Sequence, residues 1–404
     1  MVPSVNLSAE AEDLGLYAAA VARSWAHFPH LVRVDGLNTR QVGVMRDKAR
    51  LLQISVAEAM PYRHGVDWSE GLVLSGDTTA LASLARDVSI TYASVGRALS
   101  NLLESLATRT RRLRFKSGEL MLGGGPGPTI MGILNVTPDS FSDGGLYVEP
   151  QAAVEHALRM AEDGARIIDI GGESSRPGAT PVPAKVELER TVPVIEKLRA
   201  ALPSEVRISI DTMKSEVARA AVAAGAEIIN DVSGLSADSQ MRAVAAELGA
   251  TVIINHMRGS PKTMQEAPAY RHVIPEVLAD LDGLVTAAVA EGIDMERIVI
   301  DPGIGFGKRA SDNLAIMRHL AAFGSLRRPV AVGVSRKSFL AGMTSDKGPA
   351  TAERADSTLV AETCCVLGGA HILRTHDPAR AARAARLAGA VSGHLDPGDP
   401  AAPH

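Results

Sequence analysis

The stretch Gly-Ala-Arg-Ile-Ile-Asp-Ile-Gly-Gly-Glu, residues 164–173, decides the fold of this chain. Its first two residues end an amphipathic stretch of helical length, because glycine readily adopts the left-handed conformation that closes a helix. The apolar run that follows, with Asp169 near its end, predicts a buried strand. The same Gly-Ala step precedes three later runs, at Gly225-Ala226, Gly249-Ala250 and Gly369-Ala370. The chain is therefore expected to repeat a helix–strand unit.

Eight apolar runs follow residue 128, and stretches of helical length separate them. Eight strand–helix units in about 265 residues match one closed parallel barrel. A doubly wound sheet is the alternative, but it usually has fewer strands and a glycine-rich turn after the first. Here Thr-Pro-Asp-Ser-Phe-Ser-Asp-Gly-Gly (137–145) follows instead. We predict an α/β fold, a (β/α)8 TIM barrel with strands at 130–135, 166–170, 207–211, 227–230, 251–255, 297–301, 329–334 and 371–374.

The segment Gly-Gly-Gly-Pro-Gly-Pro (123–128) suits neither a helix nor a strand and marks a domain boundary. We expect a small α/β domain of unknown role at 1–124, the barrel at 125–391, and a flexible tail at 392–404. In the first domain, the pattern predicts helices near 9–26, 39–59, 77–86 and 92–108, with strands at 71–74 and 112–122. Asp77 is interpreted as the cap of the third helix.

The composition excludes several classes of protein. The chain has 42 Lys and Arg against 46 Asp and Glu, so no general field attracts nucleic acid or an anionic membrane. The cationic run 109–116 is interpreted as one solvated face rather than a nucleic-acid site. The two cysteines, Cys364 and Cys365, are too few for a disulfide framework or a zinc cluster. Without a signal peptide or a long apolar run, a cytoplasmic protein is expected.

Polar or charged residues stand at the carboxyl ends of all eight predicted strands, where barrel enzymes build their active sites. One Asp at such an end is often only a helix cap, but eight polar ends together predict a ligand site. Asp211, Asn230 and Asp301 suit the hydrogen-bond donors of a flat, nitrogen-rich heterocycle. The expected ligand therefore includes such a ring.

Cationic side chains at other strand ends suit a polyanionic group such as a polyphosphate; they are Arg176, Lys337, Arg374 and His376. Lys337 and Ser338 also open a predicted helix, whose free N–H groups bind anions. Asn135 offers an oxygen ligand for Mg²⁺, whose shell is mostly water and phosphate oxygen. A heterocycle, a polyphosphate and a metal ion are thus expected together.

The residues at these strand ends also resemble the signatures of the dihydropteroate synthase family. Met-Gly-Ile-Leu-Asn-Val-Thr-Pro-Asp-Ser-Phe-Ser-Asp-Gly-Gly (131–145) matches the first, and Asp-Ile-Gly-Gly-Glu-Ser-Ser-Arg-Pro-Gly-Ala (169–179) the second. The resemblance continues in order through Ser-Ile-Asp-Thr (209–212), Ile-Asn-Asp-Val-Ser-Gly (229–234), His-Met-Arg-Gly-Ser-Pro (256–261), Asp-Pro-Gly-Ile-Gly-Phe-Gly-Lys (301–308), Gly-Val-Ser-Arg-Lys-Ser (333–338) and Leu-Arg-Thr-His-Asp (373–377). It covers about residues 128–390.

The resemblance implies an enzyme of folate synthesis that joins 6-hydroxymethyl-7,8-dihydropterin diphosphate to p-aminobenzoate and releases diphosphate. It also implies Mg²⁺ as cofactor, inhibition by sulfonamides and a homodimer. The pterin would contact Asp211, Asn230, Asp301, Lys337, Met257, Phe306 and Gly333. The p-aminobenzoate would contact Phe141, Ser175, Arg176, Pro177 and Ser338. Asn135, Arg374 and His376 would bind diphosphate, with the metal on Asn135; the catalytic set would be Asn135, Asp143, Lys337, Arg374 and His376.

Three alternatives stay open at this point. A pterin-binding methyltransferase would share the barrel and the pterin pocket, and a non-catalytic pterin-binding paralogue would share every motif. Lys337 could instead form a Schiff base, as aldolase lysines do. The run Gly-Ile-Gly-Phe-Gly-Lys-Arg (303–309) has the wrong spacing for a phosphate loop and is interpreted as a glycine turn under the pterin. In the second signature, Ser175 stands where the family often has threonine.

Overall fold

The computed structural model describes residues 18–19, 30–59, 70–107, 110–123, 127–137, 150–174, 181–340 and 353–391. The expected tail 392–404 lies outside these residues. By packing, the chain divides into two compact units. One comprises residues 1–109 with 319–327, and the other comprises residues 110–318 with 328–404. Among the described residues, no helix combines the length and apolar character needed to cross a membrane.

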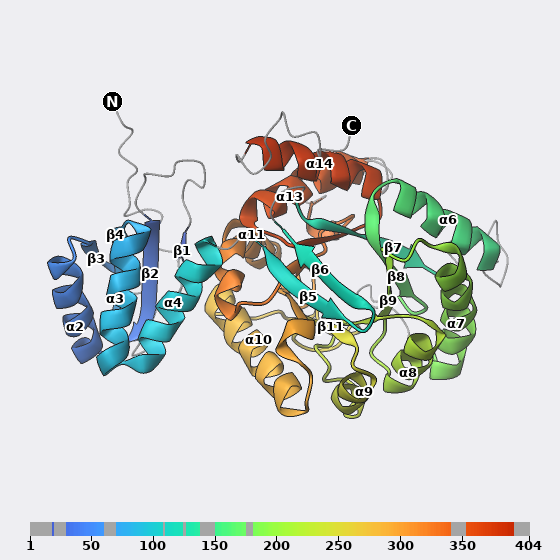
Figure 1. Ribbon diagram of the computed structural model, residues 1–404, viewed down its shortest axis with the longest axis horizontal. Helices are drawn as coiled ribbons and strands as arrows, with labels where there is room; N and C mark the ends of the chain where they lie inside the picture. Colours follow the sequence, from blue (N-terminus) through green and yellow to red (C-terminus); the bar gives the residue numbers. More distant parts are fainter. Residues whose placement is uncertain are drawn as a thin grey trace. The chain divides into compact units, whose positions relative to one another are not determined.

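The second unit is a (β/α)8 barrel, as predicted (Figure 1). Its parallel strands pair in the order β12-β11-β10-β9-β8-β7-β14-β13, and a parallel bridge between Ile300 and Val330 closes the ring. Each of the eight predicted runs overlaps one strand. The strands are β7 (Thr129–Asn135), β8 (Ala165–Gly171), β9 (Arg207–Asp211), β10 (Ile228–Asp231), β11 (Thr251–Asn255), β12 (Ile298–Asp301), β13 (Ala331–Val332) and β14 (Ile372–Thr375).

Amphipathic helices surround these strands and bury their apolar faces against them (Figure 1). Gly225, the first residue after α8, has φ 118° and ends that helix in the left-handed conformation, as the Gly-Ala pattern predicted. The helices are α6 (Pro150–Glu162), α7 (Ala184–Ala201), α8 (Ser215–Ala224), α9 (Met241–Leu248), α10 (Val273–Ala290), α11 (Ala310–Arg318), α13 (Glu353–Gly368) and α14 (Pro378–Val391), with the short 3-10 turn η2 (Met295–Arg297). A second 3-10 turn, η3 (Leu320–Leu326), belongs to the first unit.

An antiparallel hairpin precedes the first barrel strand and belongs to the barrel unit. It consists of β5 (Arg111–Phe115) and β6 (Gly118–Leu122), where one strand at 112–122 was expected. Its apolar side chains share a core with barrel residues near the amino ends of the strands: Leu113, Phe115 and Leu122 pack with Met131, Ile167, Ile228, Ile253, Val299, Ala331 and Ile372. The hairpin thus covers the end of the barrel opposite the predicted site (Figure 1).

The expected boundary at residue 124 is therefore too late, since the hairpin buries its apolar face on the barrel. The Thr251 hydroxyl adds a 2.7 Å hydrogen bond to the Arg114 carbonyl oxygen. Arg114, in the cationic run, also pairs with Asp294 at 2.7 Å and with Glu296. At least this cation of the run 109–116 therefore forms ion pairs within the barrel unit.

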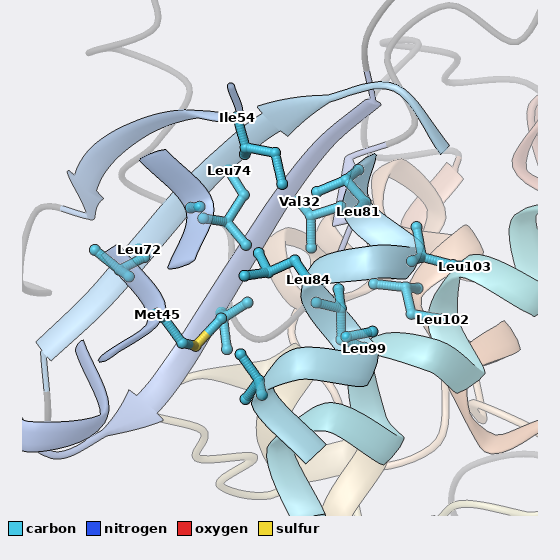
Figure 2. Packing of buried hydrophobic residues seen from close by; sticks show 14 of the residues in the cluster. Val32, Met45, Ile54, Leu72, Leu74, Leu81, Leu84, Leu99, Leu102 and Leu103 are labelled. Carbon is cyan, nitrogen blue, oxygen red and sulfur yellow. The ribbon is translucent and has the colours of Figure 1, made fainter. Parts of the chain in front are cut away.

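The first unit is a small α/β domain, as predicted, with an antiparallel sheet in the order β1-β2-β4-β3. Its strands are β1 (Ala18–Ala19), β2 (His30–Leu37), β3 (Ser55–Ala59) and β4 (Glu70–Gly76), and its helices are α2 (Thr39–Leu51), α3 (Thr78–Thr91) and α4 (Ala93–Ala107). One core joins sheet and helices, and Figure 2 shows Leu72 and Leu74 facing Leu84 and Leu99. Asp77 caps α3, accepting from Ala80 N at 2.7 Å.

Two expected helices of this unit are wrong in part. The run 39–59 is a helix only to Leu51, because the chain turns at Gln53 with φ 57° and continues as β3. Only Ala18–Ala19 are described within the expected helix 9–26, and they form β1, which pairs with β2. The strand β2 itself was not expected. These strands are fixed by sheet pairing rather than by local pattern.

Candidate active site

The strand registers bring the predicted polar residues to one end of the barrel. Asn230 pairs with Asp211 across β10 and β9, and Asn255 pairs with Asp301 across β11 and β12. Asn135 pairs with Gly171 across β7 and β8. Since parallel strands in register end together, their terminal side chains share one mouth.

Arg374 is the centre of a buried ion-pair network in this mouth. Its Nε donates to Asp169 Oδ2 at 2.6 Å, and its Nη2 donates to Asp211 Oδ2 at 2.7 Å. Asn230 Nδ2 also donates to Asp169 Oδ2, at 3.0 Å. Asp169 is fully buried, and its other oxygen, Oδ1, has no hydrogen-bond partner. Sequence reasoning noted Asp169 at a strand end but gave it no role in the site.

Asp211 titrates near neutrality in this environment. Burial raises its pKa to about 7, although the Arg374 guanidinium opposes the shift, and the nearby Asp169 carboxylate adds to it. A carboxyl group of this kind can accept from ligand N–H groups when it is ionised. A carboxyl pKa raised toward neutrality is typical of functional sites rather than of surface carboxylates.

Asp301 and Lys337 form the other side of the mouth. Asp301 Oδ1 accepts from Gly303 N at 2.7 Å, and burial raises the pKa of this carboxyl. Burial lowers the pKa of Lys337 to about 8, and Asp301 opposes this shift. Lys337 Nζ donates to the Ile304 carbonyl oxygen and lies 4.2 Å from the centre of the Phe306 ring. Lys337 and Phe306, both predicted pterin contacts, are thus together.

His376 lies at the carboxyl end of the barrel beside β13. Its Nδ1 is 2.9 Å from the Ser335 hydroxyl, and its backbone N–H donates to the same oxygen at 3.2 Å. Ser338 opens a helical stretch at 338–340, as expected, and is exposed. Gly333, a predicted pterin contact, lies beside the ion-pair network of Arg374, because a Cβ at Gly333 would be 3.7 Å from Arg374 Cβ. Met257 is half-buried in the segment after β11.

The loops predicted to hold p-aminobenzoate are not among the described residues. Phe141 and Asp143 fall in the range 138–149, and Ser175, Arg176 and Pro177 fall in 175–180. Their assignments stay predictions based on sequence.

Asn135 provides the one protein oxygen predicted for a metal. A Cβ on Gly171 would lie 3.7 Å from Asn135 Oδ1 and 3.8 Å from Asp211 Oδ2, so the missing side chain leaves a cradle between two oxygen donors. Among the described residues, no cluster of three His, Cys, Asp or Glu could hold a metal. The donor set therefore fits a magnesium ion whose other ligands come from water and substrate phosphate.

A second cluster of charges lies beside Asp211 and was missed by the sequence reasoning. Lys214 Nζ donates to Glu187 Oε2 at 2.6 Å and to Glu173, and Glu187 is fully buried. These carboxylates line a small cavity together with Asp211 and Thr212. Nothing in the local pattern of helix α7 distinguishes Glu187 from a solvated residue, so the contact depends on the tertiary fold.

Comparisons with known proteins agree with this geometry. The family model described as pterin binding enzyme matches residues 131–376. The dihydropteroate synthase of Synechocystis is 43% identical over 276 residues, 68% of this chain and 93% of that protein. The Escherichia coli synthase is 45% identical over 260 residues, 64% of this chain and 90% of that protein.

Solved structures agree as well. Xanthomonas albilineans dihydropteroate synthase with 4-aminobenzoic acid is 43% identical and aligns with a TM-score of 0.64, covering 70% of this chain and 98% of that one. The same enzyme with 7,8-dihydropteroate gives 0.61 at 41% identity, covering 69% and 98%. The Yersinia pestis enzyme in a sulfonamide complex gives 0.65 at 36%, covering 70% and 99%.

The closed (β/α)8 barrel, with these carboxylates and cations at its carboxyl end, and the family match together identify the chain as a pterin-binding enzyme. Within that class, the chain belongs to the dihydropteroate synthase family.

Proposed function

We infer that the chain condenses 6-hydroxymethyl-7,8-dihydropterin diphosphate with p-aminobenzoate, giving 7,8-dihydropteroate and diphosphate. One observation carries this inference. The strand ends that match the synthase signatures bring two titratable carboxyls, Asp211 and Asp301, together with Lys337 and Arg374 in one buried mouth. Relatives and solved structures named for this activity, at 36–45% identity, support it.

The carboxyls and Asn230 would hold the pterin ring. A 2-amino-pyrimidine edge presents several N–H donors, and ionised Asp211 and Asp301 accept such bonds strongly because the groups are buried. An analogue without those donors would leave the carboxylates unpaired, which gives the site its selectivity. Lys337, with Phe306 beneath its ammonium, would contact the acceptor side of the ring.

The diphosphate end would lie toward Arg374, His376 and Asn135. Arg374 now donates to Asp169 and Asp211, so we expect its hydrogen bonds to be redistributed when the substrate binds. A magnesium ion, held by Asn135 and by phosphate oxygens, would supply charge neutralisation for the leaving group. The cradle left by Gly171 supports this placement.

The chemical step is proposed to be dissociative. The bond between the pterin methylene carbon and the diphosphate oxygen breaks, and its electron pair leaves with diphosphate, whose charge Arg374 and His376 would stabilise. The aniline nitrogen of p-aminobenzoate then forms a bond to the carbon and releases one proton to solvent water. Because the attack is on a carbocation, this weak nucleophile needs no strong general base.

The p-aminobenzoate side is assigned to Phe141, Ser175, Arg176, Pro177 and Ser338, and Asp143 to ordering the first loop. Solved structures of similar synthases with 4-aminobenzoic acid and with a sulfonamide drug support binding of both kinds of molecule here. Replacing threonine by Ser175 keeps the hydroxyl and loses a methyl group. We therefore propose an altered sulfonamide or p-aminobenzoate affinity with activity retained.

A homodimer is also proposed, through α13 and α14. These helices pack on one another, and Val360 and Leu367 on the first and Leu387 and Val391 on the second are exposed, at 42–73%. Large apolar side chains gathered on adjacent helices are typical of an interface between copies of a chain.

The assay that tests the function measures diphosphate release from the dihydropterin substrate with and without p-aminobenzoate. Release that requires p-aminobenzoate is expected. Transfer of a methyl group from a folate to a corrinoid would instead identify a pterin-binding methyltransferase. Pterin binding with no turnover would identify a non-catalytic paralogue.

A further inference from the structure

Lys308 is a buried lysine that none of the assigned roles uses. It is 2% exposed and lies at the end of the segment Asp-Pro-Gly-Ile-Gly-Phe-Gly-Lys (301–308). Its Nζ is 2.9 Å from His256 Nδ1 and from the Gly303 carbonyl oxygen, and 3.1 Å from the Phe306 carbonyl oxygen. Burying an ammonium is costly, so such a residue persists only where its hydrogen bonds are needed.

His256 orients this ammonium. Burial lowers the pKa of His256 to about 4, so the ring is neutral at physiological pH. Its Nε2 is 3.0 Å from Asp280 Oδ2, which can only accept, so Nε2 carries the proton and Nδ1 accepts from Lys308. Arg258 donates to the same Asp280 oxygen, with its Nη2 2.8 Å from Oδ2. The chain Arg258–Asp280–His256 thus fixes where the ammonium of Lys308 lies.

The glycine loop 303–307 is held on two sides. A Cβ at Gly303 would lie 1.8 Å from the His256 carbonyl oxygen, and one at Gly305 would lie 2.7 Å from Lys337 Cδ. The loop therefore fills the space between the His256 segment and Lys337 with no room for side chains. Lys308 binds two carbonyl oxygens of the loop from below, and the loop offers the Ile304 carbonyl oxygen and the Phe306 ring to Lys337.

We propose that Lys308 is a positioning residue for the dihydropterin site: it fixes the glycine loop and, through Ile304 and Phe306, the position of the Lys337 ammonium. The proposal rests on the proposed function, since Lys337 is taken as a pterin contact. Burial lowers the pKa of Lys308 to about 7, and the Asp301 carboxylate opposes this shift.

Lys308→Met tests the proposal because methionine replaces most of the aliphatic part of the side chain and removes the ammonium donors. We expect the KM for dihydropterin diphosphate to rise at least ~10-fold, while the KM for p-aminobenzoate stays within about 2-fold. The control is Lys262→Met, an exposed lysine on the segment after β11, which should change neither value. Equal increases in both KM values, or none, would overturn the proposal.

A double-mutant cycle with Lys337→Met separates positioning from general loosening of the fold. If Lys308 acts through Lys337, adding Lys308→Met to Lys337→Met should change the pterin KM less than about 2-fold. Retention of the full ~10-fold effect would contradict the proposal. If Lys308→Met does not fold, the cycle is run with Asp280→Ala, which removes the acceptor that sets the His256 tautomer at a side chain that is 40% exposed.

Binding of 6-hydroxymethylpterin, measured by fluorescence, keeps this proposal distinct from the proposed function. Weaker binding to Lys308→Met in a protein that makes no dihydropteroate would support the positioning role and refute the activity. Normal binding and normal kinetics of Lys308→Met in an active protein would refute the positioning role alone.

Discussion

Arg374 Nη2 donates a 2.7 Å hydrogen bond to Asp211 Oδ2, and the two residues stand on strands that are not neighbours. In the barrel order, β8 and β7 lie between β9, which carries Asp211, and β14, which carries Arg374. The pair therefore spans the mouth of the barrel. We propose that Asp211 contacts the pterin and Arg374 the diphosphate, so we expect substrate binding to exchange this ion pair for contacts with the ligand.

Pterin affinity should depend on pH through Asp211. Its pKa of about 7 means that the carboxyl is protonated below neutrality, when it no longer accepts two N–H donors. The Kd of 6-hydroxymethylpterin is expected to rise as pH falls below about 7, approaching ~10-fold per pH unit. Isothermal titration calorimetry between pH 5.5 and 8.5 measures it. Asp211→Asn should bind weakly and flatten the profile, whereas an unchanged profile in this variant would assign the titration elsewhere.

Asp301→Asn should damage catalysis more than folding. The amide keeps the shape but loses charge-assisted acceptance from the pterin, so kcat/KM for the dihydropterin substrate should fall at least ~30-fold, about 2 kcal/mol. Glu247→Gln, in an exposed ion pair with Arg219, is the matched control and should stay within about 2-fold. Comparable activity of Asp301→Asn and wild type would remove Asp301 from the site.

A dissociative step predicts a secondary isotope effect at the pterin methylene. Replacing both methylene hydrogens by deuterium should slow the reaction by about 10–20% per deuterium, because the carbon becomes trigonal in the transition state. Mass spectrometry of a reaction in which the two substrates compete gives the ratio of the rate with hydrogen to the rate with deuterium. A value near unity would exclude this path and favour direct displacement by the aniline nitrogen.

The hairpin β5–β6 should be needed for a stable barrel. Phe115→Ala is expected to cost about 3–5 kcal/mol of unfolding free energy, since the ring packs in the core that closes the barrel. A chain beginning at Thr110 should likewise melt at a higher temperature than one beginning at Gly125. Equal thermal stability of the two truncated chains would mean that the hairpin is dispensable.

Charge on α13 and α14 should change the oligomeric state. Val360→Glu with Leu387→Glu would bury two carboxylates in the proposed interface, so a monomer is expected in sedimentation velocity. Ile90→Glu, on the first unit and 84% exposed, is the control and should leave the mass unchanged. A wild-type chain that sediments as a monomer would refute the dimer.

The barrel could be predicted because its signals are local. Each Gly-Ala stop and apolar run defines one unit, and β8 confirms the prediction made for residues 166–170 almost residue by residue. Likewise, the position of Asp211 and Asp301 at the ends of predicted strands was enough to predict them as site residues. The first unit was harder to predict, since β2 and β3 are strands whose pairing with β4 determines them.

Partners within the site could not be predicted from sequence. Arg374 bonds to Asp169, 205 positions away, and Lys308 bonds to His256, 52 positions away. Only closure of the barrel brings these groups together. The hairpin was misassigned for the same reason, because Phe115 finds its core on strands that come later in the chain.

The ratio of 7,8-dihydropteroate formed to diphosphate released shows most directly whether this barrel makes dihydropteroate. Purified protein is incubated with dihydropterin diphosphate, p-aminobenzoate and Mg²⁺, and products are quantified by mass spectrometry. We expect one 7,8-dihydropteroate for each diphosphate released, and neither product when p-aminobenzoate is omitted. Diphosphate released without dihydropteroate, or pterin bound without any turnover, would contradict it.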